Sequence, residues 1–81
     1  MDEHNQSELR HGFQDGNYAN AYETEDYQTF LDNLPKGKPY GRYFYRIGCL
    51  LGFFSSYELH EVPDDWQERV RIARNNYKDF V

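Results

Sequence analysis

An aromatic and apolar segment at residues 40–57 is the feature of this sequence that most restricts its possible folds. Apolar residues recur in it at spacings of three and four, and small residues follow the same period, which is typical of a helix. A third face of that helix carries Tyr45, Cys49 and Phe53. A helix that is apolar nearly all round lies at the centre of its bundle or under another chain. We therefore expect a helix over residues 41–57 that organises the domain.

The same segment allows a second interpretation, a β-hairpin with strands at 40–47 and 50–59 that turns near Gly48. Tyrosine, phenylalanine, isoleucine and cysteine favour strands, and glycine weakens a helix. However, an alternation with a period of two is not sustained, and Gly-Cys is a poor dipeptide for a hairpin turn. The helix is the preferred interpretation, and an α+β fold with a central hairpin at 40–59 is the alternative.

Helix signals flank the central segment on both sides. Thr24 with acidic residues after it is typical of a helix start, and Pro35 stops that helix because the residue before a proline avoids the helical region. Asp64 and Gln67 match a capping box, and an apolar stripe at helical spacing begins at Trp66. The sequence thus predicts a small all-α domain of three helices, at about 24–34, 41–57 and 64–79.

The first 20 residues are polar and acidic, and Gly12 and Gly16 would each weaken a helix there by about 1 kcal/mol relative to alanine. We expect a flexible acidic tail at 1–20 that orders on a partner, followed by one small domain at 21–81. The N-terminus does not resemble a secretory signal, and the longest apolar run is too short to span a membrane. A cytoplasmic location without membrane association is therefore expected.

Charge is segregated into blocks along a chain whose net charge is −5. Residues 1–34 contain eight acidic residues and one base, whereas residues 35–57 contain four bases and no acid. An acidic block at 58–68 and a basic block at 69–81 follow. Interleaved blocks favour pairing between segments and disfavour a general nucleic-acid binder. We expect no direct contact with DNA or RNA.

Groups that could perform chemistry are few in this sequence. The three histidines are scattered, and the single cysteine, Cys49, lies among apolar residues, where a thiol is typically a small buried hydrophobe. Ser55 and Ser56 could meet His60, but no third residue that would orient a base is evident. We expect no enzymatic activity, no bound metal and no cofactor.

The abundance of tyrosine and phenylalanine favours protein binding, because these side chains offer a large contact area at a small loss of conformational freedom. The leading hypothesis is a non-enzymatic, acidic protein-binding module, a regulator or inhibitor from a bacterium or a phage. We predict that its contacts come from the central segment, at Tyr40, Arg42, Tyr45, Arg46 and Phe53.

Two other functions remain open. A structural homodimer would pack two central helices together, because small residues let two backbones approach closely. That face would consist of Gly48, Gly52 and Ser55. An acidic mimic of nucleic acid would instead block a DNA- or RNA-binding protein. Its surface would consist of Glu23, Glu25, Asp26 and Asp32.

Residues 11–30 resemble the first helix of ribosome modulation factor, a family of small helical proteins of the bacterial stationary-phase ribosome. The similarity rests on HGFQDG at 11–16 and YQTF at 27–30. That family is strongly basic, as contact with ribosomal RNA demands, whereas the first third of this chain is acidic. The resemblance therefore implies a shared helical scaffold without the RNA-binding surface, and no functional residue is carried over.

Overall fold

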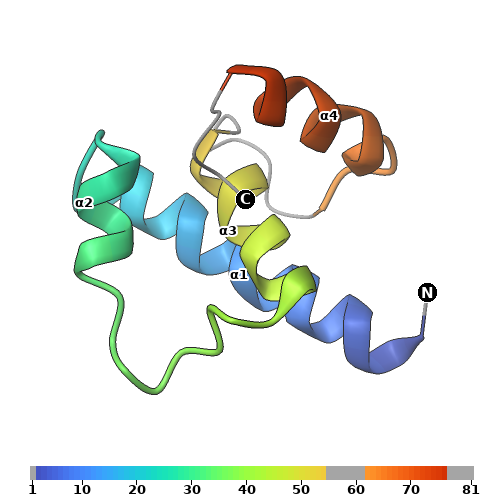
Figure 1. The fold of residues 1–81 in the computed structure, drawn as a ribbon, viewed down its shortest axis with the longest axis horizontal. Coiled ribbons are helices and arrows are strands. Elements are labelled where there is room, and N and C mark those ends of the chain that lie inside the picture. Colours follow the sequence, from blue (N-terminus) through green and yellow to red (C-terminus); the bar gives the residue numbers. More distant parts are fainter. Residues whose placement is uncertain (1, 55–61, 77–81) are drawn as a thin grey trace.

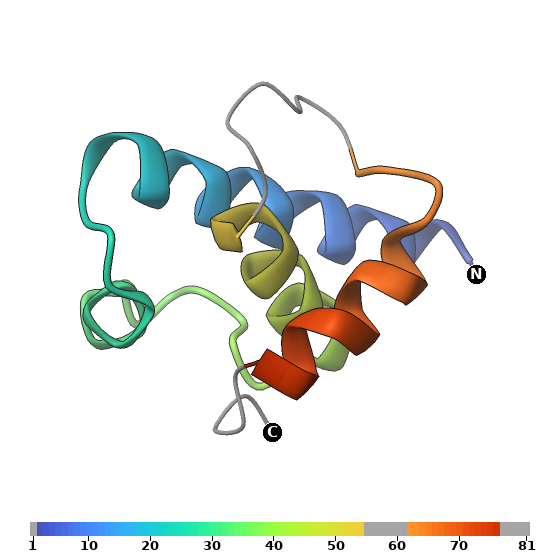
Figure 2. The same cartoon turned by 90° about the horizontal axis from the view of Figure 1, so that it is seen from above.

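The computed structural model describes residues 2–54 and 62–76. These ranges form four helices, α1 (Glu3–Tyr22), α2 (Tyr27–Asp32), α3 (Tyr43–Phe54) and α4 (Trp66–Asn76). α3 lies between α1 and α4, and α2 lies beyond the end of α1 (Figures 1 and 2). None of the helices in the described ranges combines the length and the hydrophobicity that a membrane-spanning helix needs.

The all-α prediction is confirmed, and the described ranges contain no strand. Residues 43–54 form one continuous helix, so the hairpin that would turn near Gly48 is wrong. The predicted helix at 41–57 begins two residues later, at Tyr43, and its last predicted residues lie outside the described ranges. The number of helices is a correction, because α1 was not among the three that the sequence predicted.

The N-terminal segment is the longest helix within residues 2–54 and 62–76 and not the flexible tail expected at 1–20. Asp2 caps α1 by accepting a hydrogen bond from the Asn5 N–H at 2.8 Å. The helix buries Leu9, Phe13 and Ala19. A boundary between a tail and a domain at residue 20 therefore does not exist. The prediction failed because it weighed the cost of two glycines to an isolated helix and not the packing that they permit.

Two pairs of glycines bring the backbones of α1 and α3 into contact. They are Gly12 and Gly16 in α1 and Gly48 and Gly52 in α3. A Cβ atom on Gly12 would lie 2.2 Å from the carbonyl oxygen of Tyr45, and one on Gly48 would lie 2.2 Å from the carbonyl oxygen of Leu9. No side chain can be accommodated at such distances, so the crossing requires glycine on both helices.

The close-contact face predicted at Gly48 and Gly52 exists, but α1 of the same chain occupies it. A Cβ atom on Gly52 would lie 2.0 Å from the carbonyl oxygen of Phe13. A second copy could reach this face only by displacing α1, so a homodimer through it is incompatible with the fold. Ser55, the third predicted member of the face, lies outside the described residues.

α2 is a short helix that packs its aromatic side chains against α3. It begins at Tyr27, because the Asp26 carboxylate accepts hydrogen bonds from the backbone N–H and the hydroxyl of Thr29 at 2.9 and 2.7 Å. The predicted cap at Thr24 is thus two residues too early. The Phe53 ring stacks on Phe30, and the Tyr27 ring meets it edge-on, with ring centroids 5.4 and 5.1 Å away.

Candidate protein-binding groove

α4 is held against α3 by one buried valine and one aromatic pair. Val70 is 6 % exposed, and the rings of Trp66 and Phe44 meet nearly perpendicularly with their centroids 6.4 Å apart. The helix begins at Trp66, whose N–H donates to the Pro63 carbonyl at 3.2 Å, and not at residue 64 as the sequence predicted. The Asp65 side chain pairs with the guanidinium of Arg69 at 2.9 Å.

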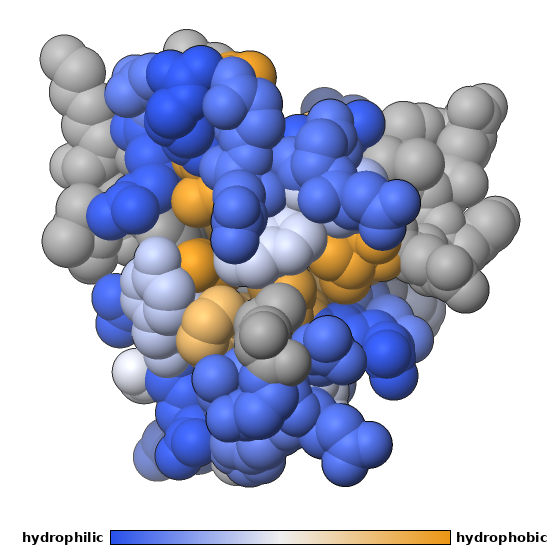
Figure 3. All heavy atoms as spheres, turned by 90° about the vertical axis from the view of Figure 1, so that its right-hand side faces the viewer, coloured by the Kyte–Doolittle hydropathy of each residue, from blue (hydrophilic) through white to orange (hydrophobic). Residues whose placement is uncertain are grey.

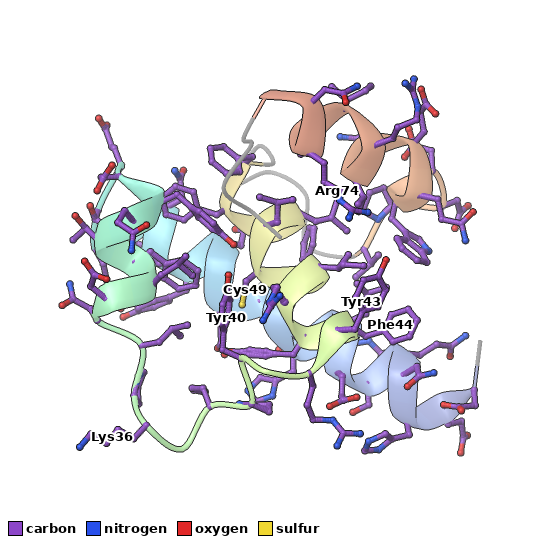
Figure 4. The ribbon with its side chains drawn as sticks, in the orientation of Figure 1. Lys36, Tyr40, Tyr43, Phe44, Cys49 and Arg74 are labelled. Carbon is purple, nitrogen blue, oxygen red and sulfur yellow. The ribbon has the colours of Figure 1, made fainter. Side chains whose placement is uncertain are left out.

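An open groove of about 550 Å³ runs between α3 and α4. Tyr43, at the entrance from α3, is 55 % exposed, and its ring lies 5.2 Å from that of Phe44. Both side chains project from the first turn of α3 (Figure 4). On the side of the molecule where α4 lies above α1, apolar atoms are exposed between two hydrophilic areas (Figure 3). The apolar wall of the groove consists of Tyr43, Phe44, Ile47, Trp66 and Val70.

The charged side chains among the described residues that line this groove are both arginines. Arg71 and Arg74 project from α4, and Arg74 lies on the side of α4 that faces α3 (Figure 4). The Nε of Arg71 donates to Glu68 Oε2 at 3.1 Å, which lowers the pKa of Glu68 and raises the pKa of Arg71. The groove therefore combines aromatic and aliphatic walls with a positively charged edge.

Two of the five predicted contact residues are part of the core. Tyr45 is 0 % exposed and Phe53 is 1 % exposed, so neither can contact a partner in this fold. The sequence could not distinguish them from their neighbours, because all faces of this helix are apolar or small. The exposed aromatic side chains of α3 are instead Tyr43 at 55 % and Phe54 at 52 %.

The other three predicted contact residues lie around the start of α3 and contact other parts of the chain. Arg42 pairs with Glu8 of α1, and its guanidinium lies 2.9 Å from the Nε2 of His4. The guanidinium of Arg46 lies over the Tyr40 ring, 5.1 Å from its centroid. These contacts fix the segment before α3 onto the helices, and none of the three residues lines the α3–α4 groove.

The four acidic residues predicted to mimic nucleic acid are all exposed, around the turn before α2 and along that helix. Two of them have a local structural role. Asp26 caps α2, and the hydrogen bonds from Thr29 lower its pKa. Asp32 accepts a hydrogen bond from the Gln28 amide at 2.9 Å. The members of this set are Glu23, Glu25, Asp26 and Asp32.

A polar cluster that the sequence did not reveal lies beside the α1–α3 crossing. The Tyr45 hydroxyl donates to Asp15 Oδ2 at 2.6 Å, and the Lys38 ammonium lies 3.2 Å from the same oxygen. Cys49 is fully buried next to this cluster, and burial raises the pKa of its thiol to about 12. Such a thiol is not ionised near neutral pH and is a poor nucleophile there. No periodic pattern links Asp15 to Lys38, so only the fold brings them together.

The buried thiol and phenol predict a loss of stability at alkaline pH. Burial and the hydrogen bond to Asp15 raise the pKa of Tyr45 above 10.0, and that of Cys49 rises from 9.0 to about 12. Above pH 9 the unfolded chain releases protons that the folded chain retains, so the free energy of unfolding falls by up to about 1.4 kcal/mol per pH unit and group. Below pH 9 this stabilisation is fully present.

Urea denaturation at several pH values up to about 11 measures the effect. Tyr45→Phe should flatten the pH dependence above pH 10, whereas Tyr22→Phe, at a tyrosine that is 77 % exposed, should leave it unchanged. An unfolding free energy that stays constant up to that pH would contradict the prediction.

The groove itself was only partly recognisable in the sequence. The apolar stripe of the last helix contains Trp66 and Val70, but periodicity alone assigns such a stripe to the core. The way α4 packs against α3 decides which side chains of this apolar stripe are buried. No local signal in the sequence encodes that arrangement. Within the part of the chain that the structure describes, no three His, Cys, Asp or Glu side chains converge as metal ligands would.

Comparisons of this chain with protein-family models, with curated proteins and with solved structures each found no match. The resemblance of residues 11–30 to ribosome modulation factor therefore stays a prediction. The candidate site rests on its geometry, an aromatic groove between α3 and α4 with arginines along one edge.

Proposed function

We propose that this chain is a non-enzymatic protein-binding module whose binding surface is the groove between α3 and α4. The observation that carries the proposal is a groove of about 550 Å³ with aromatic walls and with arginines on its α4 side. Aromatic residues and arginine are the residue types enriched at the energetic centres of protein interfaces. The binding surface thus differs from the one predicted within residues 40–53.

The contacts of Trp66 support this proposal. Its ring packs edge-on against Phe44 and is only partly buried, so one side remains able to contact a partner. Tryptophan that anchors an interface typically fills such a partly formed pocket and becomes buried on binding. Phe44 and Val70 support the ring from within the chain, which limits the entropy lost when a partner binds.

The absence of an enzymatic function is supported by the surroundings of the one candidate nucleophile that the structure describes. Cys49 is enclosed by α1 and α3, and its thiol has a pKa of about 12. Ser55, Ser56 and His60, which the sequence offered as a second candidate group, lie outside the described residues.

Photo-crosslinking tests the proposal at two exposed glutamines. In one variant a photoreactive phenylalanine analogue replaces Gln67, which lines the groove. In the control variant it replaces Gln14, which lies on α1 and does not line the groove. In cells that naturally produce the chain, we expect the Gln67 probe to form a discrete adduct with one partner protein that the Gln14 probe does not form. Equal adducts from both positions, or none from Gln67, would contradict the assignment of the groove.

A further inference from the structure

Trp66 separates the groove from a second hollow on its other side. This hollow, of about 330 Å³, lies between the first turns of α1 and the segment that leads into α4. Leu9, Val62 and Pro63 provide its apolar wall, and Arg10 and Asp64 provide its charged groups. Because Trp66 lines both hollows, they lie next to each other on the two sides of this residue. We call the two hollows together the Trp66 track.

Three arginines and one acidic residue line the Trp66 track, and Glu68 beside it pairs with one of these arginines, Arg71. Arg71 and Arg74 line one hollow, whereas Arg10 lines the other together with the single acid, Asp64. Arg10 is exposed and has no ion pair or hydrogen bond among the described residues. Basic side chains at both ends of an apolar path favour a ligand that carries negative charge on both sides of an apolar residue.

We infer that the Trp66 track binds an extended, acidic peptide segment of a partner protein, with an apolar side chain seated against Trp66. This inference rests on the proposed function and specifies the chemistry of the partner. A peptide of about eight residues spans about 26 Å when extended. The molecule measures 30 × 27 × 25 Å, so such a segment crosses the whole face on which the track lies.

The acidic character of the ligand is notable because the chain itself carries a net charge of −5. Long-range electrostatics therefore oppose the approach of an acidic partner, and only the local field of the three arginines favours it. Binding should consequently require short-range contact of the ligand with these arginines and contact of its apolar side chain with Trp66. A basic peptide would be attracted to the acidic α2 end of the molecule and not to the track.

Selection from a random eight-residue peptide library displayed on phage tests the inference without knowledge of the partner. The full chain is the target, and the Trp66→Ala variant is the reference for background binding. We expect the selected peptides to be enriched in aspartate and glutamate around a central apolar residue. Binding of a selected peptide is then followed by the fluorescence of Trp66, the only tryptophan of the chain.

Charge-reversal variants keep the test independent of the folding of the Trp66 variant. The double variant Arg71→Glu/Arg74→Glu should weaken binding of a selected acidic peptide by about tenfold or more, since two attractions become repulsions. Lys36→Glu is the matched control, because Lys36 is exposed and points away from the track (Figure 4). We expect this control to change the affinity by less than about twofold. Circular dichroism verifies that each variant is folded.

The possible failures are distinguishable. If the selected peptides are basic or show no charge preference, or if the double reversal leaves their affinity unchanged, the acidic ligand is wrong while the groove remains a binding surface. Native mass spectrometry could instead detect a second copy of the chain as the occupant of the track. This result would also contradict the inference that the ligand is an acidic segment of a partner protein. If no peptide is selected above the Trp66→Ala background, the proposed function itself fails.

Discussion

Gly48→Ala is expected to unfold the domain or to lower its free energy of unfolding by about 3 kcal/mol or more. The new Cβ atom would lie 2.2 Å from the Leu9 carbonyl oxygen and 2.8 Å from the Phe13 nitrogen. Both are backbone atoms of α1, so no side-chain rotation relieves the overlap and the helices must move apart. The higher helix propensity of alanine offsets about 1 kcal/mol of this loss at most.

A chain of this size has a total stability of about 4–12 kcal/mol, so a loss of that magnitude removes a large part of it. Gly41→Ala is the matched control, because a Cβ atom on Gly41 has nothing within 4 Å and the residue has no positive φ. The free energy of unfolding of this control should differ from that of the natural chain by no more than about 0.5–1 kcal/mol. Urea denaturation, monitored by circular dichroism, measures the free energy of unfolding of both variants. If the midpoint of Gly48→Ala equals that of the natural chain, the close crossing of α1 and α3 is wrong.

Phe53→Ala is expected to destabilise the fold by about 3–5 kcal/mol. Phe53 is 1 % exposed and contacts both buried aromatic residues of α2, Tyr27 and Phe30, whereas Phe54 contacts Tyr27. Its ring stacks on Phe30 with an angle of 16° between the planes and meets Tyr27 edge-on at 62°. α2 has only six residues and is too short to be stable alone, so its helical structure depends on these contacts.

The adjacent substitution Phe54→Ala is the control for Phe53→Ala, because it removes the same number of atoms from a side chain that is 52 % exposed. Its cost should not exceed about 1.5 kcal/mol. Hydrogen exchange gives a second readout, since in Phe53→Ala the amides of α2 should lose protection before those of α1. If the two substitutions destabilise the fold equally, the contact between α2 and Phe53 is not the main interaction that stabilises α2.

The position of α3 between the other helices restricts which of its side chains a partner can reach. α1 covers the glycine face of α3, and α2 covers the face that carries Phe53. The contact with α4 is much smaller and involves mainly Phe44, Trp66 and Val70. At the α4 side of α3, Tyr43 is 55 % exposed and Phe44 is only partly buried, and both side chains line the proposed site.

The sequence by itself determined the elements whose signals are local. The period of the apolar residues predicted the helices at α2, α3 and α4, because burial of one face requires that spacing whatever the partner. α2 ends at Asp32, two residues before the end that Pro35 predicted, and Cys49 is buried as its neighbours indicated. These outcomes depend on the backbone and on hydrophobicity within one segment, so the tertiary arrangement cannot change them much.

The tertiary structure decided everything that depends on the meeting of two segments. Gly12 and Gly16 weaken α1 in isolation, yet they stabilise it in the fold because the α3 backbone fits against them. Likewise, Tyr43 is exposed and Tyr45 is buried, although both lie in the same apolar helix. The free energy that settles such choices comes from packing between helices, and no local pattern in the sequence contains it.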